Sequence, residues 1–490
     1  MSIHDPLVVL SLATLAACGP SAAGSTGSSG EAPTGEPTTE APPSTTEAPP
    51  TTTDDGTTTT DATTGGTTEA DTTTGEPGSC AVVQGDHVAV CRAPDCAITV
   101  DLEIRCNDHD FASRGVGVAP ASDGTWYVAG RYFSPAQLFR ADVDGAEQIT
   151  GVIDDSMDRT FLMTQGPDGA PHIGVDAQGP NWEGGLHYLT RIDGAWTDTL
   201  VPGAEKFLID VKVDSQGRPH VFFDAEDYSA AVLDGGTWTT HTLAVPGSAP
   251  QFVLGPDDDE IAIAVSEQQL QALVGDQNVE LGSSLPVGTF YYQAASAAGG
   301  PTVAAALQLG DELEVAWWPD PAAVAIPGTQ GLVDACPSIE VDDPDAVCPG
   351  PCHDGGAGMV ANAFAFARSA DGVGWLAWIV TNRDIDVHYE LVNFEGSLLC
   401  QAIGDSGDTV DVLHLARVPL DGDAPAEVLT LPLPDPAQGV FTGFPGRPVG
   451  PVVLEAFGSD LALALRLRVD SEMTQFPYAR LFRIDTTKLP

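Results

Sequence analysis

The chain has 490 residues, of which 70 are acidic and 19 are basic, so its formal net charge is −51. Nucleic acid and anionic lipid headgroups are bound through Lys and Arg, so we expect neither nucleic acid nor a bare anionic membrane surface as a partner. We interpret the charge as a source of solubility. The length allows two or more domains.

The N-terminus contains an apolar run at residues 7–17, LVVLSLATLAA. The run is too short to span a bilayer, but it has the length of a signal-peptide core. It ends in Leu15-Ala16-Ala17-Cys18-Gly19, which resembles the bacterial lipobox. The resemblance implies a lipoprotein signal peptide over residues 1–17, cleavage between Ala17 and Cys18, and acylation (palmitate) of Cys18.

Two features of this terminus bear on its interpretation. Gly19 is not the aspartate that favours retention at the inner membrane in that family, so we expect a lipid-anchored protein at the outer membrane or the cell surface. The first six residues, MSIHDP, contain no Lys or Arg, which departs from the usual positive start of a signal peptide. The alternative is an ordinary secretory signal followed by an unrelated cysteine.

Residues 18–79 form a low-complexity linker of Thr, Pro, Gly, Ser and acidic residues. Such a segment cannot bury enough apolar surface to offset the entropy of ordering it. We therefore expect a disordered tether that separates a globular head from the membrane. Its Thr-rich composition also allows O-linked sugar.

Eight cysteines follow Cys18, and an even number in an exported chain indicates disulfide bonds. Four lie in a segment at residues 80–109, for which we expect disulfide staples, and four lie late in the chain. The pairing stays open within each group. Zinc binding by the first group and haem attachment at Cys348-Pro-Gly-Pro-Cys352-His353 are alternatives whose spacings do not match the known motifs. The eight are Cys80, Cys91, Cys96, Cys106, Cys336, Cys348, Cys352 and Cys400.

Short turns followed by apolar strands recur along residues 110–490, as in GPDGAPHIGVD and DSQGRPHVFFD. A second mark repeats as well, because Trp196 and Trp238 each follow a turn 42 residues apart. The longest step between turns contains a Cys-containing insertion near residues 325–360. Eight turns are found, at Gly124, Gly169, Gly217, Asp258, Gly300, Gly372, Gly422 and Ser459.

A period of 40–50 residues with several short strands is typical of a β-propeller, in which each sheet covers its faces with its neighbours. Segments with helical periodicity are almost absent. We predict an all-β fold with about seven blades, the first and last strands sharing one blade; six or eight blades remain compatible. A pair of β-sandwiches is the alternative architecture.

The repeat unit resembles those of sialidase-type and BNR-like propellers, through its Gly-x-Pro-His turn and its Trp strand. The intact Asp-box of that family is absent, and the closest stretch, at Ser122–Trp126, has compressed spacing. The resemblance therefore assigns no catalytic residue.

Other motifs carry no chemistry that we can assign. The stretch Gly404–Asp408 resembles the nucleophile motif of trypsin-like proteases, but it has no accompanying base and is interpreted as a turn. We assign no metal ligands and expect no cofactor. Calcium at an acidic cluster is left open, and His172 and His220 are expected to pack at strand ends. The clusters are Asn107–Asp110, Asp257–Glu260 and Asp342–Asp345.

The sequence thus predicts a lipid-anchored, monomeric propeller that acts as a binding or scaffolding head for a protein or a glycan. The alternative is a hydrolase or lyase acting on polysaccharide at the channel mouth. An enzyme would place carboxylates with shifted pKa values beside Arg or His at one end of the channel. We expect a binder rather than an enzyme.

Overall fold

The computed structural model describes residues 80–84 and 96–106, and then residues 117–490 with gaps. The longest gaps are 150–157, 283–290, 434–451 and 467–475. The predicted signal peptide, Cys18 and the linker lie outside the described residues. Within those residues the chain is almost entirely β-strand, with two short 3-10 helices, η1 (Pro256–Asp258) and η2 (Thr486–Lys488). This described part contains no helix of the length and apolarity that crossing a membrane requires.

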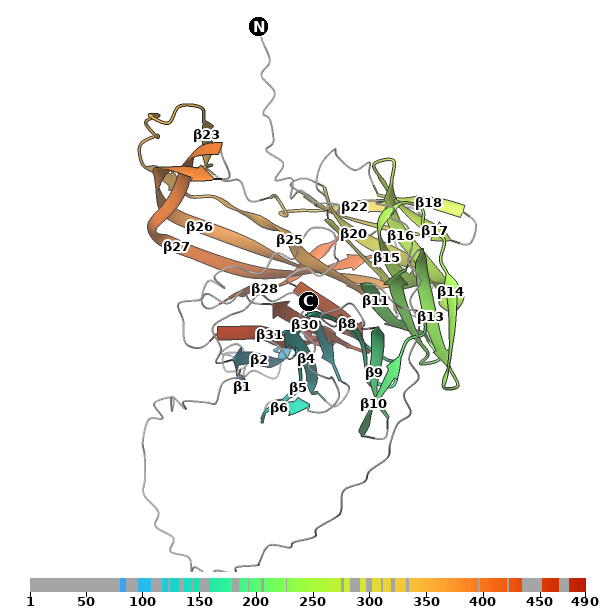
Figure 1. Cartoon of the computed structure of the whole chain (residues 1–490). Helices are drawn as coiled ribbons and strands as arrows, with labels where there is room; N and C mark the ends of the chain where they lie inside the picture. Colours follow the sequence, from blue (N-terminus) through green and yellow to red (C-terminus); the bar gives the residue numbers. More distant parts are fainter. Residues whose placement is uncertain are drawn as a thin grey trace, which may run out of the picture. The chain divides into compact units, whose positions relative to one another are not determined.

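The strands form seven antiparallel sheets, which we number in chain order (Figure 1). Sheet 1 contains β3 (Gly117–Pro120), β4 (Trp126–Arg131), β5 (Ala136–Asp142) and β6 (Gly145–Ile149). Sheet 2 contains β7 (Asp158–Gln165), β8 (Pro171–Gln178), β9 (Leu186–Ile192) and β10 (Ala195–Leu200). Sheet 3 contains β11 (Phe207–Val213), β12 (Pro219–Asp224), β13 (Tyr228–Asp234) and β14 (Thr237–Thr242).

The next two sheets repeat this plan. Sheet 4 contains β15 (Ser248–Leu254), β16 (Glu260–Ser266), β17 (Gln269–Val274) and β18 (Gln277–Leu281). Sheet 5 contains β19 (Tyr291–Ser296), β20 (Val303–Leu309), β21 (Glu312–Trp318) and β22 (Ala322–Ile326).

Sheet 6 is larger because two of its strands are very long. It contains β25 (Ala357–Arg368), β26 (Val373–Phe394), β27 (Ser397–Pro419) and β28 (Ala426–Pro432). The hairpin of β26 and β27 extends past the other two strands and carries the short strands β23 (Ile339–Val341) and β24 (Cys352–Asp354) (Figure 1). Two disulfides, Cys336–Cys352 and Cys348–Cys400, fasten this extension.

Sheet 7 joins the two ends of the described chain. It contains β29 (Val452–Phe457), β30 (Asp460–Arg466), β31 (Phe476–Asp485), β2 (Ile98–Cys106) and β1 (Cys80–Gln84). The pairing of β2 with β31 confirms the prediction that the first and last strands share one sheet. Residues 80–109, which the sequence set apart, therefore contribute two strands to the closing sheet.

Seven hydrophobic clusters show that the sheets form a closed ring. Each cluster contains buried residues of two consecutive sheets, from sheets 1 and 2 through sheets 6 and 7. A further cluster joins sheet 7 back to sheet 1, through Leu102, Trp126 and Leu481 among others. Burial on both faces explains why strands such as β12, PHVFFD, are apolar without alternation. The predicted β-propeller is confirmed.

The recurring turns join the first and second strands of the sheets. In sheet 2 the N–H of Gly169 donates to the carbonyl of Gly166 at 2.9 Å, and in sheet 3 that of Gly217 donates to Asp214 at 3.0 Å. Both glycines have φ of 81°, a value that favours glycine because a side chain is strained there. Gly422 is the exception, because in the chain it falls between β27 and β28, the third and fourth strands of sheet 6.

Candidate functional site

A cavity of about 810 Å³ lies in the centre of the ring, at the end where these turns connect the first and second strands. The first strand of each of six sheets contributes to its wall, and a first strand has one edge without a partner strand inside its own sheet. The cavity is therefore lined by strand edges as well as side chains. The contributing strands are β7, β11, β15, β19, β25 and β29.

Two glutamines hold neighbouring strand edges together around the cavity. The Gln251 amide donates to the carbonyl of Tyr292 at 2.6 Å and accepts from the N–H of Ala294 at 2.8 Å. The Gln293 amide repeats the contact one sheet further, donating to Phe364 at 2.8 Å and accepting from Phe366 at 3.2 Å. Each amide thus satisfies one donor and one acceptor of the adjacent first strand.

Asp210 occupies the same register position in β11 that Gln251 and Gln293 occupy in β15 and β19, three residues before the last paired residue. Its carboxylate accepts from the N–H of Val211 at 2.8 Å and lies 3.0 Å from Nζ of Lys212. Burial raises the pKa of Asp210, although Lys212 opposes the shift. At this register position β11 therefore has an ion pair of Asp210 with Lys212, whereas β15 and β19 have amide side chains.

Glu455, in β29, is a further carboxylate of the cavity, whose lining also includes Asp168 and Asp460. It accepts a hydrogen bond from the backbone N–H of Gln165 in β7. Burial raises its pKa to about 7, the charge of Asp210 adds to this shift, and Lys212 and the Gln165 N–H oppose it. A carboxyl group with this pKa exchanges a proton readily near neutral pH.

Two arginines complete the charged lining. Arg483 is paired with Asp460, with Nε and Nη2 at 2.8 and 2.7 Å from Oδ2. Arg368 is only 4% exposed, and its Nε and Nη1 have no hydrogen-bond partner among the described residues. Burial lowers the pKa of Arg368, but a guanidinium remains charged at any physiological pH.

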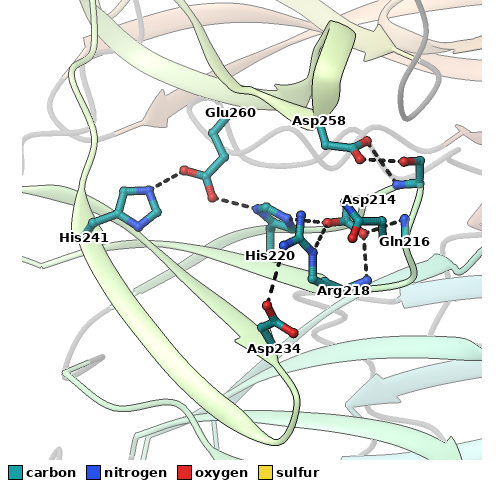
Figure 2. A network of polar contacts seen from close by, with 9 residues as sticks. Asp214, Gln216, Arg218, His220, Asp234, His241, Asp258 and Glu260 are labelled. Carbon is teal, nitrogen blue, oxygen red and sulfur yellow. Dashed lines mark hydrogen bonds and ion pairs between the residues drawn. The ribbon is translucent and has the colours of Figure 1, made fainter.

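A second polar cluster lies between sheets 3 and 4 (Figure 2). Glu260 in β16 binds two histidines of sheet 3, with Oε1 2.7 Å from Nδ1 of His220 and Oε2 2.5 Å from Nε2 of His241. The other ring nitrogen of His220 faces Asp214 at 3.4 Å. Burial alone would raise the pKa of Glu260, but the hydrogen bonds and charge of the histidines outweigh it and lower the pKa.

The same cluster fixes the turn between β11 and β12. Asp214 accepts from the N–H groups of Gln216 and Arg218 and from Nε of Arg218, at 2.9, 2.8 and 2.6 Å. Ser215 donates through its N–H and its hydroxyl to Asp258 of sheet 4, at 3.0 and 2.5 Å. Because these polar groups are used in contacts within and between the two sheets, the cluster is a structural clamp (Figure 2).

His172 lies where His220 lies, one sheet earlier, but without carboxylate contacts. Its Nδ1 lies 2.5 Å from the hydroxyl of Tyr188, and burial lowers its pKa to about 4. The two histidines thus pack at strand ends in separate environments. Trp196 and Trp238 also have equivalent roles, since each packs edge-on against a tyrosine of the preceding sheet, Tyr127 and Tyr188 respectively.

Other predicted residues have varied outcomes. Gly404–Asp408 is not a turn: it lies inside β27, beside an irregularity in its pairing with β26. Asp342–Asp345 is an exposed turn, and Asn107–Asp110 lies outside the described residues. Within the described ranges, no group of three or more His, Cys, Asp or Glu side chains is arranged to hold a metal ion.

The cysteines lie in two settings. The late group forms the two disulfides of the sheet 6 extension. Cys96 is disulfide-bonded, Cys80 and Cys106 are backbone partners in the register of β1 and β2, and Cys91 lies outside the described residues. Disulfides are typical of extracytoplasmic proteins, and they place this chain in that class.

Sequence reasoning missed the cavity residues. Their signal was a charged residue inside an otherwise apolar strand, as in FLIDVKV around Asp210 and VVLEAF around Glu455. Such a residue has either an internal partner or a polar cavity to face. The strand pattern does not say which sheets share that cavity.

Fold and site together define a β-propeller protein with a ligand-sized cavity on its axis, lined by both polar and apolar side chains. No protein family matches the sequence, and no characterised protein matches it.

Several solved structures show weak likeness. Virginiamycin B lyase from Staphylococcus aureus is 8% identical, with 83% of this chain and 99% of the other covered and a TM-score of 0.38. An α-L-arabinanase from Penicillium chrysogenum is 8% identical over 78% and 96% of the chains, with a TM-score of 0.35. A Dyadobacter fermentans protein of unknown function is 12% identical over 80% and 100%, with a TM-score of 0.39. At these values the likeness assigns no function.

Proposed function

We propose that this protein is an extracytoplasmic binding protein whose propeller holds a saccharide in its central cavity. The observation that carries the proposal is the cavity itself, which has the size of a small-ligand site and is lined by charged, amide and apolar side chains from several sheets. A folded protein partner does not fit a volume of about 810 Å³. A saccharide, with many hydroxyls, suits a wall of carboxylates, amides and cationic groups.

The proposal includes the N-terminal anchor and tether expected from the sequence. Cys18 would carry the lipid, and residues 19–79 would hold the propeller away from the membrane at the outer membrane or the cell surface. The test is mass spectrometry of the mature N-terminus. An acylated Cys18 supports the anchor, and an unmodified residue 18 contradicts it.

The second candidate function is hydrolysis or elimination on a polysaccharide. One observation favours it: Glu455 has a pKa of about 7 and shares the cavity with Asp210 and Lys212. A carboxyl group with that pKa can donate or accept a proton at neutral pH. With Arg368 and Arg483 in the same lining, this arrangement supports the criterion stated above for an enzyme, which requires shifted carboxylates beside Arg or His.

The experiment is binding of a panel of neutral and acidic oligosaccharides to the full-length protein in detergent, measured by calorimetry. The cavity variants Lys212→Met and Glu455→Gln should weaken binding by about tenfold, which corresponds to about 1.4 kcal/mol. The exposed variant Glu280→Gln is the control. Unchanged affinity in both cavity variants, or no binding across the panel, would contradict the proposal. Release of new reducing ends that stops in Glu455→Gln would favour the enzyme instead.

A further inference from the structure

Arg368 has a distinctive place in the cavity. It is the last paired residue of β25, opposite Gly374. In each of the other first strands that line the cavity, the last paired residue is uncharged. Arg368 is therefore the one cation at this position. The uncharged residues are Gln165, Val213, Leu254, Ser296 and Phe457.

The guanidinium of Arg368 lacks the partners that a buried cation requires. With 4% exposure it has lost nearly all of its water, and two of its nitrogens donate to no described group. The nearby carboxylate of Asp371 is engaged in its own turn, where it accepts from the Ser369 hydroxyl at 2.5 Å and the Val373 N–H at 3.4 Å. A buried charge left in this state is costly to the fold.

The other cations of the cavity have carboxylate partners. Lys212 lies 3.0 Å from Asp210, and Arg483 is bound to Asp460. An anion that enters the cavity therefore meets one cation, Arg368, that has no carboxylate bound to it among the described residues. Asp168, Asp210 and Glu455 in the same cavity disfavour a doubly charged ligand group.

The net charge of −51 does not exclude an anionic ligand. In physiological salt the potential of surface charges decays over about 8 Å, so distant carboxylates are screened. Inside an enclosed cavity, a contact with a desolvated guanidinium is much less screened. The local environment therefore decides the charge preference of the site.

We propose that Arg368 binds a singly charged oxyanion of an acidic saccharide, either a carboxylate or a sulfate ester. This inference rests on the proposed saccharide site and specifies its substrate class. The anion accepts hydrogen bonds from the guanidinium, which supplies charge-assisted donors that the fold leaves unused. The saccharide hydroxyls then face the amide and carboxyl groups of the wall.

The first test compares three oligosaccharides of equal length by calorimetry on the full-length protein: trigalacturonate, its methyl ester and a sulfated galactose trimer. We expect one of the two charged probes to bind at least about tenfold more tightly than the ester. Arg368→Gln should reduce that affinity to the level of the ester and leave the ester unchanged. Arg417→Gln, an exposed arginine of the same sheet, is the matched control.

The second test separates this inference from the proposed function. Acetate and sulfate are titrated against thermal unfolding of the wild type and of Arg368→Gln, since an anion bound to the native state stabilises it. Greater stabilisation of the wild type supports the anion site even if no saccharide binds. Binding of the ester as tightly as the charged probes, or equal anion responses in both proteins, overturns the inference while leaving a neutral saccharide site intact.

Discussion

His220 Nδ1 in sheet 3 lies 2.7 Å from Glu260 Oε1 in sheet 4, so a side-chain contact joins two sheets that share no backbone ladder. The two side chains are 6% and 10% exposed. Neighbouring sheets of a propeller otherwise adhere through apolar packing, which has little directional preference. The contact therefore fixes how sheets 3 and 4 are aligned.

Replacing Glu260 with Gln should lower the free energy of unfolding by about 3 kcal/mol, because it removes the charged partner of a buried contact. The pKa of Glu260 in the fold is lower than its ordinary value of 4.5. Its contribution is therefore fully present above about pH 4.5 and is lost as the pH falls through the lowered pKa. Urea unfolding at several pH values measures both effects.

The control for this prediction is Glu280→Gln, an exposed carboxylate in the outer strand β18 of the same sheet. It should unfold within about 0.5 kcal/mol of the wild type. Equal urea midpoints for the two variants would show that the clamp contributes nothing to stability.

Glu455 should titrate near pH 7 in the native protein, which carbon-detected NMR of its carboxyl group can follow. Because its pKa in the fold is above the ordinary value of 4.5, the native state binds the extra proton between these values. Its contribution to stability is therefore fully present below about pH 4.5 and falls as the pH rises to about 7. With water in the cavity, we expect a loss of about 1–2 kcal/mol. In Glu455→Gln this loss should be absent.

Lys212→Met should move the titration of Glu455 above pH 7, because the ammonium group of Lys212 favours the ionised carboxylate. The same variant should raise the pKa of Asp210 further, since it removes the paired charge. Lys488→Met, which removes a half-exposed lysine at the C-terminal end, is the control. A downward movement of the Glu455 midpoint would contradict the assigned electrostatics.

The sequence allowed the architecture to be predicted, because each sheet has its own local signal. Gly169 and Gly217 mark turns with positive φ, and apolar runs such as that of β12 mark strands buried on both faces. Eight turns were counted for seven sheets because sheet 6 contains two of them: Gly372 lies between its first two strands, β25 and β26, and Gly422 between its last two, β27 and β28. A turn between the first and second strands and a turn between the third and fourth strands of a sheet have the same local composition.

The cavity could not be predicted in the same way. Glu455 receives its hydrogen bond from Gln165, almost three hundred residues earlier, because closure of the ring brings sheets 7 and 2 to one axis. Neither residue lies in a motif. Arg368 could not be recognised from the sequence either. Its Nε and Nη1 lack hydrogen-bond partners among the described residues, which only the packed structure reveals.

Asp101 and Arg480 provide a test of ring closure. Arg480 donates through Nε and Nη2 to the two oxygens of Asp101, at 3.1 and 3.0 Å, and both side chains are buried. The contact joins β2 to β31. Asp101→Asn should lower the free energy of unfolding by about 3 kcal/mol, whereas exposed Glu312→Gln should have little effect. Urea unfolding of the two variants measures the difference, and similar stabilities would mean that the β2–β31 backbone pairing and apolar packing close the ring without help from this ion pair.

The disulfide Cys348–Cys400 should stabilise the extension of sheet 6 rather than the ring. It closes a loop of 52 residues between the segment after β23 and the start of β27. Replacing both cysteines with serine should make residues 342–351 sensitive to proteolysis. The main unfolding transition should stay within about 1 kcal/mol of the wild type. A loss of several kcal/mol in that transition would place the extension within the cooperative unit.

The partnership of β2 and β31 has a consequence for biosynthesis. Asp101 and Arg480 are separated by 379 positions. During synthesis β2 therefore cannot pair with β31 until nearly the whole chain has been made. During that interval its edge is open to foreign chains. A propeller with fewer sheets exposes its first strand for a shorter time during synthesis, so this chain depends more on protection of that edge before the ring closes.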